Sequence, residues 1–550
     1  MPELQAFPNE IFTSIINQLV ISVGIYKAVR LRSVNRAFNS AILYAICVVQ
    51  VVDINDPATP DLARRMLPQL KAQIVLKKSV SDESEKDYTL FFIAKLNQVL
   101  DHLTRANGER QIEQHRRIAE AAAHKYPNTR LDMSSPHRCD DVGPQNVLCG
   151  AVILGDLELV KTLLKQRSDA VANIPGYGLP KGEHAYLEYI QESSYLGWPL
   201  RLAATWGHNH LVCYFLEHGA DPHVGWDYYT RKGDWEPNMY VGVGMANVCR
   251  EQTGSTLRAA VLGNHEDVVQ TLLQPKHRIS PSDAEYFRII VAAGKVGNIS
   301  LVHTLIEATG KSLQDFPGVG EEIMWHAVYN GHYRVVQMAL DSGVDVNAAP
   351  IMDCRNYGCA LSIAASLGNT RMVRFLLDHG ADASFSHDAQ SFLDPIEIAA
   401  NHGHIEVVEL LLARGADPKR AFRRAADGGQ AHMIQWLSDR DPSLLSRPSV
   451  DRISLGMEAM LRAVLRQNAA VISLLVKLGV PLSEGYRYTS SEPPIVVAKR
   501  IGADWIVDLL LSLGAKDEDV DFNITKQYNT KVERGGILVT KRTWEWVGKY

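Results

Sequence analysis

The chain has 550 residues, several times the roughly 100 to 200 residues of a single domain, so it has to form several domains or an array of repeats. Hydrophobic residues make up 46% of the chain and charged residues 22%, which is typical of a folded protein and not of a disordered one. The formal net charge of −5 excludes the overall positive excess of many proteins that bind nucleic acids or anionic membranes.

The first residues, Met1 to Gln5, have neither the basic stretch nor the apolar stretch of a secretory signal. The longest apolar run, residues 41–49, is far shorter than the roughly 20 residues of a membrane-spanning helix. We therefore expect a soluble intracellular protein of the cytoplasm or nucleus, with its seven cysteines as free thiols.

The first predicted element is an amphipathic helix within residues 1–47. Ile11, Ile15 and Leu19 recur at helical spacing and lie on one face of this helix. The segment resembles an F-box through Phe7, Pro8, Glu10, Ile11, Ile15, Leu19, Leu31 and Val34.

The F-box resemblance implies that these residues bind the adaptor protein of a cullin-RING ubiquitin ligase. The segment departs from the family pattern at Phe7, where the family has Leu, and in a longer connection between Leu19 and Val34. The alternative is an amphipathic helical segment that caps the rest of the fold.

Residues 48–143 are predicted to be a helical linker. Residues 111–125 have a helical pattern, and the charged stretch 77–87 is a candidate hinge.

Residues 144–516 contain an internal repeat with most intervals near 33 residues. Five copies have a pair of small residues, two variable residues and an anchor glycine, and five weaker copies keep part of this pattern. Four, five and eight residues after the anchor the side chains are apolar in nine of ten copies; after Gly263 they come one residue late, which predicts a longer loop. The anchors are Gly155, Gly207, Gly263, Gly297, Gly331, Gly368, Gly403, Gly429, Gln467 and Gly502.

A second set of glycines stands 12 residues after six anchors, where a helix needs a residue that tolerates positive φ in order to end. Each unit is therefore predicted to be a helix, a short turn, a second helix and a glycine cap. A unit this short has to bury its apolar face against its neighbours. The cap glycines are Gly219, Gly343, Gly380, Gly415, Gly479 and Gly514.

This array resembles ankyrin repeats. The predicted fold is all-α, an ankyrin-repeat α-solenoid with β-turn or hairpin loops, preceded by a small F-box-like helical segment. Two copies between about residues 416 and 470 deviate from the pattern and leave the register there open.

Two consecutive repeats carry long insertions, near residues 168–197 and 223–254. Aromatic residues with a polar tip are favoured in protein interfaces. These loops are our candidate partner-binding site, and the alternative is that their rings fold back onto the early repeats. The candidate residues are Tyr186, Tyr189, Trp226, Tyr228, Tyr229 and Trp235.

The C-terminal tail, residues 517–550, has two glycines, Gly535 and Gly536, between β-favouring stretches. We expect a hairpin that covers the last repeat, since terminal repeats need a cover for their apolar side.

The motifs of common enzymes are incomplete in this sequence. Residues 309–312 end like a phosphate-binding loop, but the required first glycine falls on Leu305. His208, His332 and His404 directly follow anchors, which indicates a repeated structural role such as hydrogen bonding near the turn. We expect no catalytic residues, no cofactor and no metal site.

The predicted function is that of a non-catalytic adaptor for protein–protein interaction. It would be the substrate receptor of a cullin-RING (SCF-type) ubiquitin ligase, binding proteins through its ankyrin surface without direct contact to nucleic acid or membrane. The alternatives are an ankyrin-repeat transcriptional coregulator, for instance of a fungal secondary-metabolite gene cluster, and an enzyme with an unrecognised site.

Overall fold

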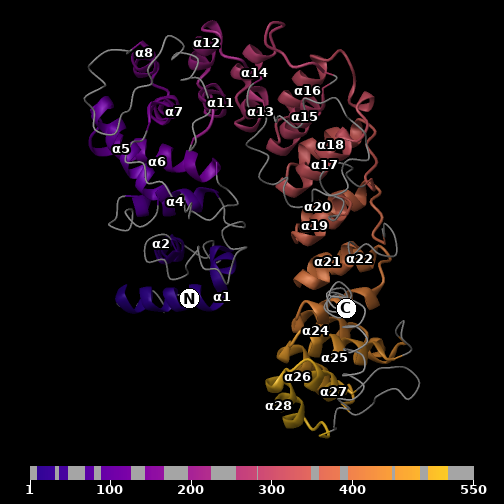
Figure 1. Ribbon diagram of the computed structural model, residues 1–550. Coiled ribbons are helices and arrows are strands. Elements are labelled where there is room, and N and C mark those ends of the chain that lie inside the picture. Colours follow the sequence, from indigo (N-terminus) through magenta and orange to yellow (C-terminus); the bar gives the residue numbers. More distant parts are fainter. Residues whose placement is uncertain are drawn as a thin grey trace, which may run out of the picture. The chain divides into compact units, whose positions relative to one another are not determined.

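The computed structural model consists of two compact units, which divide the chain between Gly310 and Lys311 (Figure 1). The predicted helical fold is confirmed, and none of the helices among the described residues is long and apolar enough to span a membrane. The structure describes residues 9–30, 36–46, 68–79, 88–125, 143–165, 196–223, 255–281, 283–348, 358–384, 394–448, 453–482 and 493–517.

Unit 1 begins with helices that precede the repeats. The rings of Phe12 on α1 and Phe38 on α2 meet edge to face at 5.8 Å. Helix α6 includes the predicted helical stretch 111–125 and packs against α4 and α5. The helices are α1 (Asn9–Arg30), α2 (Arg36–Tyr44), α4 (Pro68–Ser79), α5 (Tyr88–Thr104) and α6 (Gly108–Lys125).

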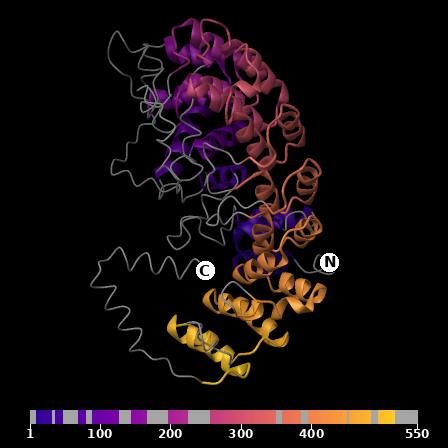
Figure 2. The same cartoon turned by 90° about the vertical axis from the view of Figure 1, so that its right-hand side faces the viewer.

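Helix pairs follow in both units, and within each unit they succeed one another in chain order (Figures 1 and 2). Within each unit the first helix of each pair packs against the first helix of the next, as α11 does with α13 and α19 with α21. Unit 1 contains α7 (Pro144–Leu154) with α8 (Leu157–Lys165), α11 (Pro199–Thr205) with α12 (Asn209–Glu217), α13 (Thr256–Leu262) with α14 (Glu266–Leu272) and α15 (Ala284–Val296) with α16 (Ile299–Glu307).

Unit 2 begins with a short 3₁₀ helix, η6 (Leu313–Asp315), and a second one, η7 (Pro442–Ser446), precedes its fifth helix pair. Its pairs are α17 (Val319–Asn330) with α18 (Tyr333–Asp341), α19 (Ala360–Ser366) with α20 (Thr370–Asp378), α21 (Pro395–His402) with α22 (Ile405–Ala413), α23 (Pro418–Asp427) with α24 (Ala431–Arg440), α25 (Leu455–Leu465) with α26 (Ala469–Lys477) and α27 (Pro494–Arg500) with α28 (Asp504–Ser512).

The predicted anchors lie in the left-handed region of backbone conformation, with one correction. At the third copy Asn264 has φ 62°, whereas Gly263 has φ −75°. Our prediction of a longer loop after Gly263 is therefore wrong. The whole pattern is shifted by one residue there, and the anchor is Asn264. Asn adopts this conformation more readily than most residues.

The irregular register between residues 416 and 470 begins with a short connection between two repeats, from the end of α22 to the start of α23. Helix α22 ends at the cap Gly415, and Asp417 already caps the next helix, its Oδ1 accepting a hydrogen bond from the Lys419 amide at 2.9 Å. Because no extended loop separates these two helices, the repeat is shorter than its neighbours.

The core lies between the first and second helices of each pair. The residue five positions after the anchor is β-branched and has no exposed surface in nine repeats. Successive repeats therefore shield one another from water, as expected of a stacked array. This row consists of Val160, Val212, Val269, Val302, Val336, Val373, Val408, Ile434 and Ile472, each 0% exposed.

Candidate protein-binding surfaces

Helix α1 has two apolar faces with different surroundings. Ile16 and Val20 are buried, with 1% and 0% of their surface exposed. Ile11 and Ile15, which belong to the predicted adaptor-binding face, are 47% and 38% exposed, and Leu19 on the same face is half-buried. Two isoleucines in contact with water on a helix that already has a packed face form an apolar surface available for a partner.

The other residues of the predicted F-box-like set are only partly described. Glu10, in the first turn of α1, is exposed. Phe7, Pro8, Leu31 and Val34 lie outside the described residues.

The six aromatic candidates of the insertions, Tyr186, Tyr189, Trp226, Tyr228, Tyr229 and Trp235, also lie outside the described residues. The described residues on either side show where the insertions enter the array. One joins α8 to α11 and the other joins α12 to α13, so both precede the first helix of a repeat, and α11 and α13 pack together.

Imidazole hydrogen bonds link successive repeats. The Nε2 atom of His208 lies 3.2 Å from the carbonyl oxygen of Ile153, and Nε2 of His404 lies 3.2 Å from that of Ser366. The structural role predicted for these two histidines is confirmed, and His332 occupies the corresponding N-cap position of α18.

Sequence reasoning missed one member of this set, His265, because the anchor had been placed at Gly263. Its Nε2 atom lies 3.0 Å from the Thr205 carbonyl oxygen. In another repeat Gln430 replaces the histidine and donates from Nε2 to the Asn401 carbonyl oxygen at 3.0 Å. An amide donor therefore serves the same purpose as the imidazole.

Burial lowers the pKa of His208, and the nearby charges of His210, Arg117 and His265 act in the same direction, while its hydrogen bond to Ile153 opposes them. The ring is therefore neutral near pH 7, and its Nε2–H can donate to the carbonyl. This hydrogen bond joins two successive repeats.

A buried charged network joins α21, α23 and α25 in unit 2. Arg424 Nε lies 2.9 Å from Glu397 Oε2, and Arg462 NH1 lies 2.8 Å from Asp427 Oδ2. Four arginines face four carboxylates, so the charges balance, and the network connects repeats without an excess charge for a ligand. We call Asp394, Glu397, Arg420, Arg423, Arg424, Asp427, Glu458 and Arg462 the charged network.

The side chain of Asp394 in this network is 5% exposed and caps α21 by accepting from the Ile396 amide at 3.0 Å. Burial raises the pKa of Asp394, and its bonds to Ile396 and Arg420 act in the opposite direction. The Asp394 cap and the following Pro395 form the start of α21.

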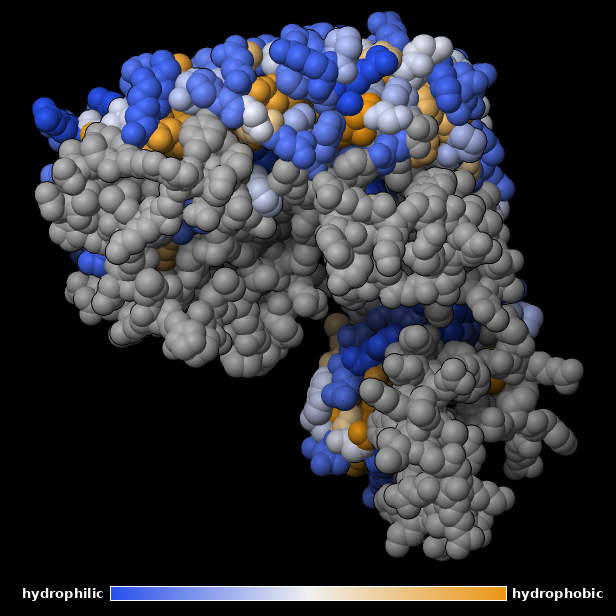
Figure 3. Space-filling view, turned by 45° about the horizontal axis from the view of Figure 1, so that its top comes forward, coloured by the Kyte–Doolittle hydropathy of each residue, from blue (hydrophilic) through white to orange (hydrophobic). Residues whose placement is uncertain are grey.

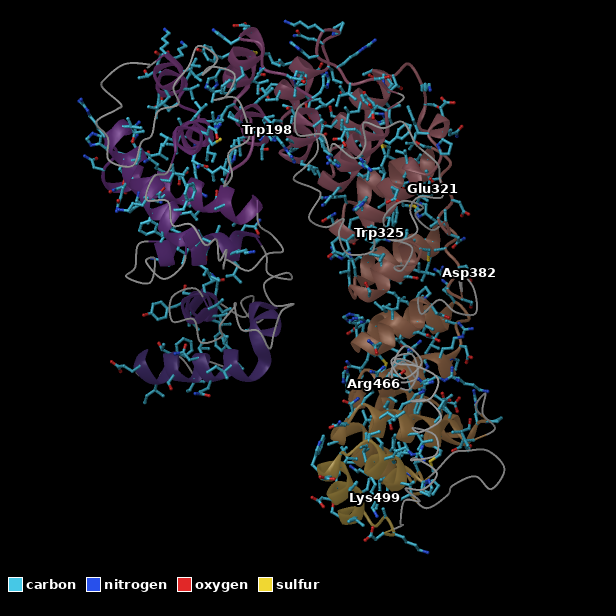
Figure 4. All side chains as sticks on the ribbon, in the orientation of Figure 1. Trp198, Glu321, Trp325, Asp382, Arg466 and Lys499 are labelled. Carbon is cyan, nitrogen blue, oxygen red and sulfur yellow. The ribbon has the colours of Figure 1, made fainter. Side chains whose placement is uncertain are left out.

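Single hydrophobic side chains are exposed elsewhere in the array. Trp325 lies on α17 (Figure 4). Its ring stacks on that of Tyr329 at 5.7 Å, and Tyr329 is 53% exposed. The side of unit 1 that carries α12, α14 and α16 is mostly hydrophilic with isolated hydrophobic residues (Figure 3). Such scattered residues are normal on protein surfaces.

The chemistry-bearing residues of the described ranges fit structural roles. In these ranges no group of three or more His, Cys, Asp or Glu could hold a metal ion. Leu305, the residue that interrupts the phosphate-loop motif, is buried in α16. Cys149, Cys213 and Cys359 are free thiols, and burial raises the pKa of Cys359.

Comparisons with known proteins agree with the helix pairs. A family model for three ankyrin repeats matches residues 289–386 and 349–421, and a single-repeat model matches residues 198–225. The chain is 31% identical over 134 residues to the "Ankyrin repeat and KH domain-containing protein mask-1" of Caenorhabditis elegans, a match that covers 24% of this chain and 5% of that protein.

A second relative is the "Ankyrin repeat, SAM and basic leucine zipper domain-containing protein 1" of Ovis aries, 39% identical over 74 residues, which are 13% of this chain and 14% of that protein. The chain thus spans only a small part of both relatives. A crystal structure of the human ASB11 ankyrin repeat domain matches with 20% identity and a TM-score of 0.32, over 42% of this chain and 99% of that domain. The family matches and the stacked helix pairs together establish that this chain carries ankyrin repeats.

Proposed function

We propose that the protein is a non-catalytic substrate receptor of a cullin-RING ubiquitin ligase. Its ankyrin repeats support a role in protein–protein interaction. In this proposal the repeats and their aromatic insertions bind the target, and α1 binds the adaptor protein of the ligase. Such a receptor acts in the cytoplasm or nucleus and works by raising the effective concentration of the target near the ligase.

The observation that carries the proposal is the apolar face of α1. Ile11 and Ile15 remain exposed although Ile16 and Val20 already hold the helix against its neighbours. Burying an aliphatic side chain on a partner contributes about 1.5 to 3 kcal/mol when it is fully exposed beforehand, so two half-exposed isoleucines supply part of a specific interface. The residues of this face are also those that carry the F-box resemblance.

The direct test is binding of the purified full chain to a purified F-box-binding adaptor. The variant has Ile11→Asp and Ile15→Asp, and the matched control has Ile112→Asp, because Ile112 is a 64% exposed isoleucine on α6. The proposal expects the wild type and Ile112→Asp to bind alike and the double variant to bind at least about tenfold more weakly. A wild-type chain that does not bind the adaptor, or a double variant that binds as the wild type does, contradicts it.

The target-binding role of the insertions needs a separate test, because rings that fold back onto the repeats would also be sensitive to mutation. Trp226→Ala and Trp235→Ala are compared with the wild type for both captured proteins and thermal unfolding. The proposal expects loss of captured proteins at an unchanged unfolding temperature. Unchanged capture with a lower unfolding temperature supports the folded-back alternative.

A further inference from the structure

The last helix pair, α27 with α28, differs from the nine pairs before it at two positions whose side chains are buried in the other repeats. Five residues after the anchor, nine repeats have a β-branched residue that is 0% exposed. The tenth has Val507, which is only half-buried. A residue of the same type at the same position is thus less covered where no further described repeat follows.

A second row changes at the same place. Three residues before the anchor, nine repeats have Gly, Ala or Val, all buried, whereas the last repeat has Lys499, whose side chain is 24% exposed. A charged side chain at a position of close helix contact opposes the docking of another repeat, because the ammonium group would lose its water. Leu511 on α28 is also exposed, at 38%. We call Lys499, Val507 and Leu511 the end face; Lys499 lies on α27 at the end of unit 2 (Figure 4).

The chain itself leaves α28 beside this face. After the cap Gly514, Asp517 turns back so that its Oδ1 lies 2.6 Å from Lys499 Nζ. The following residues Glu518, Asp519 and Asp521 are acidic, whereas the end face is cationic at Lys499. Further on, the sequence has large apolar side chains that could cover Val507 and Leu511. They are Trp544, Trp546, Val547 and Tyr550.

From this juxtaposition we infer that residues 518–550 of the same chain cover the end face. Helix α28 has nine residues, a length of about 14 Å, which about five extended residues can pass along, so the 518–550 segment is long enough to cross the face and return. The acidic start stays beside Lys499, which Asp517 already pairs, and the apolar end covers Val507 and Leu511. A single stretch of chain can cover the two apolar groups while leaving Lys499 in contact with water, which a rigid helix pair packed on the same face cannot do.

Hydrogen exchange of the full chain tests this inference. It is compared with a chain that ends at Asp517 and with a full-length variant carrying Trp544→Ser and Trp546→Ser. We expect exchange in α27 and α28 to be about tenfold faster in both, with α19 and α20 unchanged in the same samples as internal control. If the shortened chain does not fold, hydrogen exchange of the double tryptophan variant tests the inference, because this variant keeps all of its repeats.

The occupant is identified by two further measurements. Adding a peptide of residues 518–550 to the shortened chain restores slow exchange if the tail is the cover. Protection in the full chain is independent of protein concentration if the cover is intramolecular, and it rises with concentration if a second copy covers the face. Equal exchange of α27 and α28 in all three chains, or protection that depends on concentration, overturns the inference.

Discussion

At the scale of single residues, the anchor Gly368 and the cap Gly380 are glycines for different physical reasons. A Cβ atom added at the anchor Gly368 would lie 2.6 Å from Nδ1 of His404, the residue that hydrogen-bonds back to Ser366. A Cβ atom added at the cap Gly380 would meet nothing within 4 Å. Both have positive φ, 65° and 90°. Position 368 therefore needs glycine for conformation and for space, and position 380 for conformation alone.

Gly368→Ala is accordingly expected to be more destabilising than Gly380→Ala. Both variants place a side chain at positive φ, which costs about 1 to 2 kcal/mol, and Gly368→Ala in addition displaces His404 from its hydrogen bond, worth about 1 kcal/mol. Urea unfolding of the two variants measures the difference. In a His404→Ala background the excess cost of Gly368→Ala should disappear, and an excess that persists would show that the imidazole is not its cause.

The titration of His208 gives a prediction on pH. Because burial holds its pKa below the ordinary value in the folded state, the unfolded chain binds a proton more strongly, and stability is lost as pH falls below about 6.5. His208→Gln keeps a side-chain donor, as Gln430 does in its own repeat, but does not titrate. The urea midpoint of the variant should therefore fall less than that of the wild type between about pH 7.5 and about pH 5.5. Equal falls would contradict a contribution from this ring.

At the scale of helices, the charged network lies where the connection between two repeats is shortest. Helix α23 follows its predecessor after only the Ala416-Asp417 turn, and its arginines reach carboxylates on both neighbouring first helices. The four carboxylates of the network are at most 14% exposed, so removing an arginine leaves negative charge in excess in a place with little access to water.

Arg462→Met tests this dependence. Arg462 pairs with Asp427 and Glu458, whose side chains are 4% and 10% exposed. Each carboxylate keeps a second arginine, Arg424 or Arg423, but four carboxylates then face three arginines, so the loss of Arg462 is expected to cost about 3 kcal/mol. The matched control is Arg440→Met, since Arg440 and its partner Glu409 are 53% and 56% exposed and the pair contributes at most about 1 kcal/mol. Unfolding free energies of the two variants in urea provide the comparison. Equal small losses would mean that the network does not stabilise the helices it joins.

At the scale of the whole molecule, the repeat pattern was sufficient to predict the helix pairs but not every register. Gln467 was identified as an anchor from the residues around it, and its φ of 57° agrees. Asn264 was missed because Gly263 fitted the pattern. Gly263 serves another purpose, since a Cβ atom there would lie 2.5 Å from the Thr205 carbonyl oxygen. A glycine in a sequence does not reveal whether it is needed for conformation or for space.

The candidate binding surfaces were less predictable than the fold. Both Ile11 with Ile15 and Ile16 with Val20 are apolar and helical in spacing, so the sequence alone does not say which pair packs inside the protein and which is exposed. The charged network depends on which helices become neighbours, and the irregular spacing around α23 concealed this. These features depend on contacts between distant residues, whereas the repeat depends on local spacing.

The central claim is that neighbouring repeats shield one another from water, and Val373→Asp tests it most directly. Val373 is 0% exposed in α20, and its pair contacts the pairs before and after it within unit 2. Hydrogen exchange should accelerate most in α19 and α20, less in α17, α18, α21 and α22, and least in α27 and α28, because stability in a stacked array passes between nearest neighbours. Equal acceleration in every helix of unit 2, or a change confined to α19 and α20, would contradict the stacked arrangement.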